Sequence, residues 1–124
     1  DAVFEIGNNF TVSANAKISV ANHIKVGDDN MWSYDNVIMD TDRHQITNEN
    51  GEILNYNRPV AFGNHVWMGC RTIILKGTEI ADGCVIASGS NIRGKYIEQN
   101  CVITTNGKIL KQNIRWKRDW AINS

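Results

Sequence analysis

The sequence has little of what several large classes of protein require. The 124 residues include one proline and three cysteines, and thirteen basic residues balance thirteen acidic ones. A net charge of zero argues against binding nucleic acid or a membrane surface through overall charge. No apolar run approaches the roughly 20 residues of a membrane span, and no signal peptide is visible. We therefore expect a chain without a membrane span or a nucleic-acid partner.

The cysteines also exclude common uses of this residue. Cys70, Cys84 and Cys101 are odd in number and none lies in a C-x-x-C pair, so neither a disulfide framework nor a zinc knuckle is indicated. A cytoplasmic location is the expectation that follows. We interpret Cys84 as a small packing residue, and Cys101 as another if the register slips so that Ile97 leads its repeat.

What the sequence does contain is a period of six. Apolar residues recur at Phe62, Met68, Ile74, Ile80, Ile86 and Ile92. Four positions after the first five of these come small or β-branched residues, namely Val66, Thr72, Thr78, Cys84 and Ser90. A helix repeats near 3.6 and a strand near 2, so neither explains this period. A period of six is typical of a β-helix, in which each turn stacks identical positions.

A shorter array precedes this one, at Ile6, Val12, Ile18 and Ile24, but its spacing to Phe62 is not a multiple of six. An insertion is therefore expected, and we predict an irregular coil followed by an exposed loop from about Thr41 to Asn57. The predicted single domain has a first array at about 6–29, the coil and loop at 30–59, a second array at 60–105 and a C-terminal cap at 106–124.

The cap carries two interpretations. Ile109, Leu110 and Ile114 could form one face of a short helix that covers the open end of the coil. Five basic residues also gather here, Lys108, Lys111, Arg115, Lys117 and Arg118. They suit either a solvated cap or contacts with the phosphates of a nucleotide cofactor.

Chemistry at neutral pH points to the three histidines, because imidazole can accept a proton and return it. His44 stands in the sequence Asp40-Thr41-Asp42-Arg43-His44-Gln45-Ile46. A nearby carboxylate can hold an imidazole in one tautomer and favour its cationic form. We expect His23 and His65 to face outward and to take no catalytic part.

The run from Gly63 to Gly94 resembles the signature of hexapeptide-repeat acyltransferases, especially the acetyl-CoA-dependent O-acetyltransferases related to galactoside, maltose and polysaccharide acetyltransferases. The resemblance implies a left-handed parallel β-helix that assembles as a homotrimer, with the active site between subunits. A D-x-D-x-H-x-I stretch carries the catalytic histidine in these enzymes, and His44 matches it. The resemblance thus implies that His44 is a general base, oriented by Asp42 or Asp40.

The same resemblance implies acetyl-CoA as co-substrate and no metal. The pantetheine arm would lie in a groove between subunits, and a backbone N–H at Cys70 would help to stabilise the oxyanion. Lys108 matches a lysine of the family's terminal loop, although the preceding Thr105-Asn106-Gly107 lacks the usual proline. The residues implied in cofactor binding are Trp67, Gly69, Cys70, Ser88, Arg93 and Lys108.

The resulting hypothesis is an O-acetyltransferase that acts on a sugar or glycan hydroxyl. Two alternatives stay open at this point. One is a metal enzyme of the γ-carbonic-anhydrase type, although the histidines fall 21 residues apart and lack a close pair. The other is a non-catalytic β-helix scaffold, which would gain no stability from coenzyme A.

Overall fold

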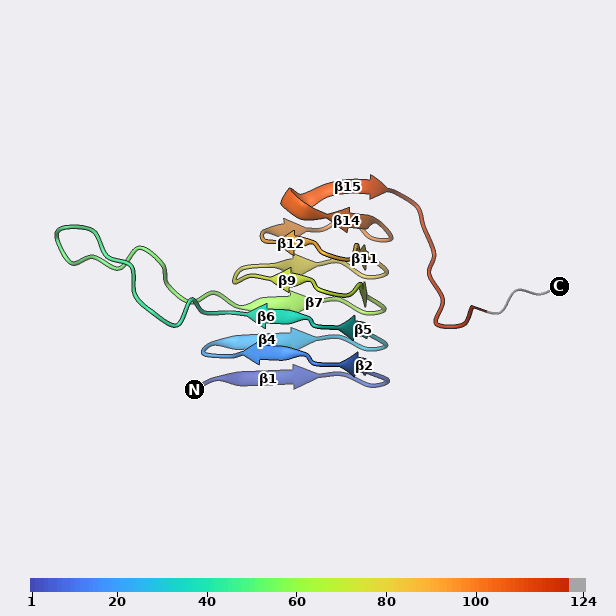
Figure 1. Ribbon diagram of the computed structural model, residues 1–124, viewed down its shortest axis with the longest axis horizontal. Coiled ribbons are helices and arrows are strands. Elements are labelled where there is room, and N and C mark those ends of the chain that lie inside the picture. The colour runs from blue at the N-terminus through green and yellow to red at the C-terminus, as the bar shows by residue number, and fades with distance from the viewer. Residues whose placement is uncertain (121–124) are drawn as a thin grey trace.

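The chain winds into a stack of short turns with three sides, as the computed structural model shows for residues 1–120 (Figure 1). The first side contains the parallel strands β1 (Val3–Ile6), β4 (His23–Val26), β7 (Val60–Phe62), β10 (Glu79–Ile80) and β13 (Lys95–Tyr96). The second contains β2 (Thr11–Ala14), β5 (Met31–Tyr34), β8 (Trp67–Met68), β11 (Val85–Ile86), β14 (Val102–Thr104) and, at its edge, β15 (Lys108–Lys111). The third contains β3 (Lys17–Ser19), β6 (Val37–Met39), β9 (Ile73–Ile74) and β12 (Asn91–Ile92). The predicted all-β fold of stacked parallel strands is confirmed, and it is a β-solenoid.

Turn 1 comprises β1 to β3, turn 2 comprises β4 to β6, turn 3 comprises β7 to β9, turn 4 comprises β10 to β12, and turn 5 contains β13 and β14. The single helical segment among residues 1–120 is the 3₁₀ turn η1 (Thr105–Gly107). No helix in this part of the chain is long and apolar enough to cross a membrane.

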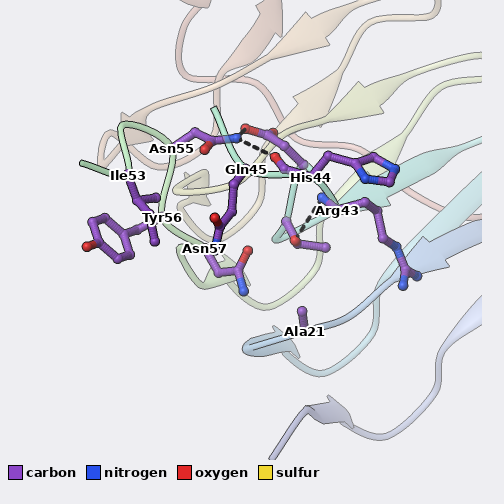
Figure 2. Close-up of a pocket in the computed structure, with 10 residues that line it drawn as sticks. Ala21, Arg43, His44, Gln45, Ile53, Asn55, Tyr56 and Asn57 are labelled. Atoms are coloured by element: carbon purple, nitrogen blue, oxygen red, sulfur yellow. Dashed lines mark hydrogen bonds between the residues drawn. The ribbon is translucent and has the colours of Figure 1, made fainter. Parts of the chain in front are cut away.

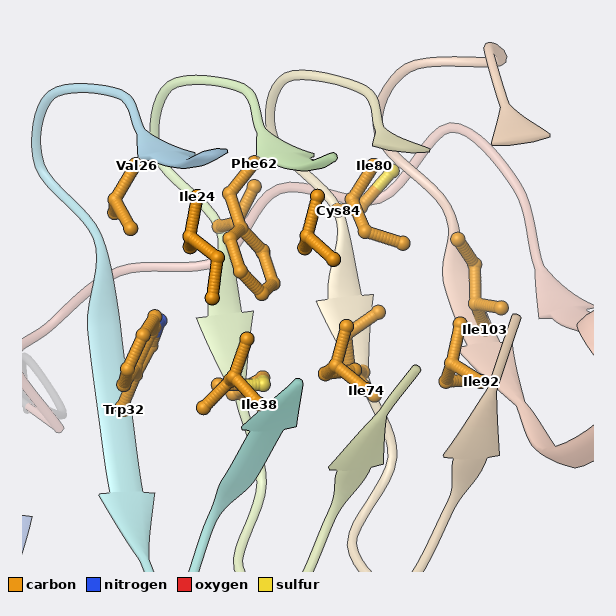
Figure 3. Close-up of a cluster of buried hydrophobic side chains, with 14 of the residues drawn as sticks. Ile24, Val26, Trp32, Ile38, Phe62, Ile74, Ile80, Cys84, Ile92 and Ile103 are labelled. Atoms are coloured by element: carbon orange, nitrogen blue, oxygen red, sulfur yellow. The ribbon is translucent and has the colours of Figure 1, made fainter. Parts of the chain in front are cut away.

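The period of six places one apolar residue per side in the interior. All six predicted residues from Phe62 to Ile92 are buried, at 0 to 3% exposure, and they stack in columns along the coil (Figure 3). The small residues fill a second set of columns, where Thr78 and Ser90 satisfy their hydroxyls by donating to the backbone carbonyls of Leu75 and Ala87, both at 2.6 Å. Small polar residues are therefore tolerated in the core because the corner backbone lies within reach.

The cysteine interpretation is confirmed, but the register of the last turn differs from the expectation. Cys84 and Cys101 are fully buried. Tyr96 pairs with Ile80, and Ile97 is 84% exposed, so Ile97 does not lead a repeat. The last turn reaches this column in 16 residues, two fewer than the turn before it, because Ile80 pairs with Phe62 on one side and Tyr96 on the other.

The segment predicted as an irregular coil is regular, and this is a correction. β5 and β6 pair in parallel with strands of turns 1 and 3. The repeat was obscured because turn 1 advances by 20 residues, so that Ile6 pairs with Val26 and Phe4 with Ile24. Ile24 therefore continues the column that becomes Val60, and its distance of six from Ile18 is coincidental.

The predicted C-terminal helix is also wrong. Lys108 to Lys111 form β15, which pairs antiparallel with the edge of β14 after the η1 turn. An exposed strand edge offers a row of unpaired backbone groups, and a returning strand satisfies them better than a helix laid across it. The part of the predicted cap beyond residue 120 lies outside the described residues.

After β15 the chain runs back along the side of the coil, and we call residues 112–120 the C-terminal strap (Figure 1). The Trp116 ring stacks on His65 with centroids 3.7 Å apart, and its Nε1 donates to the His65 carbonyl at 2.8 Å. Arg118 reaches turns 1 and 2, where it donates to Thr11 Oγ1 at 2.7 Å and to Asp29 Oδ1 at 3.0 Å. The strap thus contacts three consecutive turns.

The alternation of facing along one strand gives a matched test of the packing. Ile74 is fully buried, whereas its neighbour Ile73 points outward and is 36% exposed. Ile74→Ala should lower the free energy of unfolding by about 2–5 kcal/mol, because it leaves a cavity in the core. Ile73→Ala should cost less than about 1 kcal/mol. Equal losses in chemical denaturation of the two variants would contradict the inward column.

Candidate functional site

The inserted loop leaves the coil after β6 and returns at β7, and it projects far from the stack (Figure 1). It is a narrow hairpin. Leu54 N–H donates to the Ile46 carbonyl at 2.8 Å, and Thr47 bridges Ile53 in antiparallel fashion. The Asn48 side chain closes the tip by accepting from the N–H groups of Asn50 and Glu52. The loop is therefore ordered by its own hydrogen bonds.

Asn55 joins the two sides of the loop at its root. Its Nδ2 donates to Asp42 Oδ2 at 3.0 Å and to the His44 carbonyl at 2.9 Å, and its Oδ1 accepts from Ile46 N–H at 2.7 Å (Figure 2). One side chain thus fixes the backbone on both sides of His44. We call Asn55 and its three partners the loop bracket.

The two aspartates near His44 have different surroundings. Asp40 is fully buried, and its carboxylate accepts from the N–H groups of Ala21 and Asn22 at 2.7 and 2.8 Å. Asp42 is 40% exposed and pairs with Lys76 Nζ at 2.7 Å. The hydrogen bonds from Lys76 and then Asn55 lower the pKa of Asp42. Asp40 therefore anchors the start of the loop to turn 1, and Asp42 ties the loop to turn 4's leading corner.

His44 is exposed and lines a cavity of about 320 Å³ at the root of the loop. The walls are Ala21, Thr41, Asp42, Arg43, Gln45, Ile53, Asn55, Tyr56 and Asn57. The structure brings His44 and Asp42 to this one cavity. Within residues 1–120, no hydrogen bond links the His44 imidazole to either aspartate.

The residues expected to bind the cofactor fall into two groups. Trp67 ends on the corner between β8 and β9, where Gly69 packs so closely on Ser88 that a Cβ would lie 2.6 Å from its Oγ. The Cys70 N–H donates to the same Ser88 Oγ at 3.2 Å. The structure thus brings Trp67, Gly69, Cys70 and Ser88 together, on a corner that we call the glycine corner.

Arg93 and Lys108 lie elsewhere on the same chain. Arg93 sits on a different corner, between β12 and β13, and Lys108 begins β15. Tyr34 is a member of the glycine corner that sequence reasoning missed. Its hydrogen bond with the Cys70 thiol, followed by that of Ser88, lowers the pKa of Cys70. Asn55 and Lys76 were missed as well, although the Asn50-Gly51 turn could have suggested that Ile46 and Leu54 pair.

The other two histidines have partners of their own. The ring of His23 contacts the carboxylate of Glu5 on the outside of the coil. His65 Nδ1 lies 2.6 Å from Asp29 Oδ2, and its Nε2 lies 2.9 Å from the Trp116 carbonyl. Both lie away from the His44 cavity. His65 holds the C-terminal strap in place.

Known proteins resemble this arrangement in sequence. The chain is 41% identical over 70 residues to the polysialic acid O-acetyltransferase of Neisseria meningitidis, covering 54% of this chain and 33% of that protein. It is 35% identical over 100 residues to the galactoside O-acetyltransferase of Escherichia coli (strain K12), covering 78% and 47%. The chain is related to the hexapeptide-repeat acetyltransferases. No family model matches the sequence.

Solved hexapeptide-repeat acetyltransferases share the fold. The structure of a polysialic acid O-acetyltransferase superposes with a TM-score of 0.84 at 31% identity, covering 98% of this chain and 65% of the other. A galactoside acetyltransferase in complex with coenzyme A gives a TM-score of 0.62 at 22% identity, covering 98% and 74%, and shows the fold alone. The chain spans a third to a half of the length of the two curated relatives.

The loop bracket predicts the effect of losing one amide. Asn55→Ala removes the acceptor for Ile46 N–H, so that amide should exchange with solvent about tenfold faster, as expected for the loss of a net hydrogen bond of about 1 kcal/mol. Asn57→Ala is the control, because Asn57 lines the same cavity outside the bracket. Hydrogen exchange followed by NMR measures both. Unchanged exchange at Ile46 in Asn55→Ala would contradict the bracket.

The Asp42 pair predicts an acid limit for the loop root. The lowered pKa of Asp42 means that its ionised form is favoured in the folded state, so the pair stabilises the fold above the ordinary value of 3.8. This stabilisation should be lost as the pH falls below that value through the lowered pKa. The side-chain amide signal of Asn55 should shift in that range in wild type and stay constant in Asp42→Asn. A transition centred above pH 5 would contradict the assignment.

Proposed function

We propose that this chain transfers an acetyl group from acetyl-CoA to a hydroxyl group of a sugar or glycan. The observation that carries the proposal is His44, a side chain able to take up a proton, on a braced loop that opens onto a cavity of about 320 Å³. Two relatives support it by their names, one a polysialic acid and one a galactoside O-acetyltransferase. Because the chain spans at most about half of those relatives, the activity of the whole protein is part of the proposal.

In this proposal His44 is the general base. It removes the proton from the acceptor hydroxyl as the oxygen attacks the thioester carbonyl, and it later returns the proton to the departing sulfur. The new bond is the ester C–O bond and the broken bond is the thioester C–S bond, so atoms and charge balance. Acetyl-CoA supplies the activated acyl group.

Asp42 is the better candidate to orient His44. It lines the same cavity and is partly open, whereas both oxygens of Asp40 already accept backbone N–H groups. Asn55 joins Asp42 to the His44 backbone, so the carboxylate also fixes where the imidazole begins. A fixed starting geometry lowers the cost of reaching the reactive arrangement.

The glycine corner fits the amide-rich arm of coenzyme A. A side chain at Gly89 would meet nothing within 4 Å, so the backbone beside Ser88 is open to a ligand. Exposed backbone groups can bond the amides of such an arm, and the N–H at Cys70 is proposed to help hold the oxyanion. A galactoside acetyltransferase of this fold binds coenzyme A.

A homotrimer with a shared site is part of the proposal for a geometric reason. The loop that carries His44 leaves the coil at the corner between the third and first sides, whereas the glycine corner lies between the second and third sides. A loop of one subunit facing the glycine corner of a neighbour would bring the two together. The same arrangement would let Arg93 or Lys108 of one subunit reach a cofactor on another. We place the protein in the cytoplasm, in keeping with its three free cysteines.

The general base gives the decisive test. His44→Ala should lower turnover by about 10²- to 10⁴-fold and leave the affinity for acetyl-CoA nearly unchanged. His23→Ala is the matched control and should retain activity, because His23 contacts Glu5 on the outside of the coil. The assay is release of coenzyme A with a panel of sugars and glycans as acceptors. Near-normal turnover in His44→Ala would overturn the mechanism.

A further inference from the structure

A second cavity adjoins that of His44 and is lined by positive charge. It has a volume of about 370 Å³. We call it the cationic cavity, and its lining residues are Asp42, Arg58, Leu75, Lys76, Gly77, Arg93 and Gly94. Three of these side chains are cations and one is a carboxylate, so the lining carries an excess of two positive charges.

The excess charge belongs to the two arginines. Lys76 is neutralised by Asp42, with 2.7 Å between Nζ and Oδ2. Among the ion pairs of residues 1–120, none includes Arg58 or Arg93. Guanidinium groups bind planar anions such as carboxylates through two parallel hydrogen bonds, so these two side chains favour an anionic ligand.

The cavity is fixed to the rigid part of the molecule. Arg58 N–H donates to the carbonyl of buried Asp40 at 3.0 Å, and the Arg58 stem packs beside Gly77, with Cδ 3.5 Å from where a Cβ would stand. Arg93 follows β12 directly, and its carbonyl accepts from the Tyr96 hydroxyl. Both cations are therefore presented by the coil itself and not by the tip of the loop.

The position of the cavity indicates which molecule supplies the anion. Asp42 forms part of the wall of both cavities, so a ligand in the cationic cavity lies next to the space in front of His44. The thioester must meet the acceptor hydroxyl near His44, and the whole pantetheine arm separates the thioester from the cofactor phosphates. A negative charge this close to the base is thus more easily supplied by the acceptor than by the cofactor.

We propose that the cationic cavity binds a carboxylate carried by the saccharide acceptor, so that the chain selects acidic sugars. The inference rests on the proposed function, because it assumes that the acceptor occupies the His44 cavity. Arg58 and Arg93 hold the carboxylate, while the Asp42–Lys76 pair separates the two cavities and keeps the carboxylate away from the base.

The test compares ligands that differ only in charge. The probes are the methyl glycosides of N-acetylneuraminic acid and glucuronic acid, each set against its own methyl ester, titrated into the full chain by NMR at low salt. The free acids should bind at least about tenfold more tightly than the esters, as expected for charge-assisted hydrogen bonds. The preference should weaken with added salt.

Two double variants locate the effect. Arg58→Gln/Arg93→Gln should abolish the preference for the acids, whereas Lys17→Gln/Lys25→Gln removes the same charge from strands β3 and β4 and should preserve it. Equal binding of acid and ester by wild type would overturn the inference, as would equal loss in both double variants. A cofactor origin of the anion would appear as weaker coenzyme A binding in Arg58→Gln/Arg93→Gln with the preference for acids intact.

An acetylation assay separates this inference from the proposed function. If wild type acetylates neutral and acidic sugars equally well, the function stands and the acidic preference fails. If wild type binds the acids selectively but releases no coenzyme A from acetyl-CoA with any acceptor, the carboxylate site stands and the acetyltransferase proposal fails.

Discussion

The architecture depends on the hydrogen bonding of each turn to the next, because this bonding fixes which side chains lie above one another. Backbone N–H groups such as those of Gly27 and Gly63 donate to carbonyls one turn along the chain, at 3.0 and 2.7 Å. A parallel ladder of this kind keeps Phe62, Ile80 and Tyr96 in one column. The length of a turn therefore has to change by whole residues that are absorbed at the corners, as the turns of 20, 18 and 16 residues do. The rigid stack in turn gives the inserted loop two fixed ends, at β6 and β7.

The period of six made the central turns predictable, because each sixth residue faces the interior with no exception between Phe62 and Ile92. The ends were harder for an opposite reason. Extra residues in turn 1 placed Ile24 at a deceptive distance from Ile18, and the shortened last turn moved the column to Tyr96. The helix predicted for the C-terminus failed because helical spacing of Ile109 and Leu110 says nothing about the free edge of β14 that awaits them. Handedness came from resemblance alone.

The candidate site divides in the same way. His44 was recognisable from the local pattern around it, since the pattern lies within seven residues. The partners of that pattern lie far away in sequence, with Asn55 across the loop and Lys76 one turn further along, and no local signal connects them to His44. The two aspartates look equivalent in sequence, yet one is saturated by buried N–H groups and the other remains half open. Such differences arise only when the chain has folded.

The C-terminal strap changes how the stack behaves as a polymer. Solenoids are ordinarily one-dimensional, since each repeat contacts only its neighbours and the ends can fray independently. Here Ile114 is hydrogen-bonded to Asn100 in the last turn, while Arg118 is bonded to Asn9 and Thr11 in the first. Opening either terminus therefore disturbs the same segment, and the two ends of the array share one free energy of opening. A linear chain of repeats becomes a closed cooperative unit, with its least stable turns linked to each other.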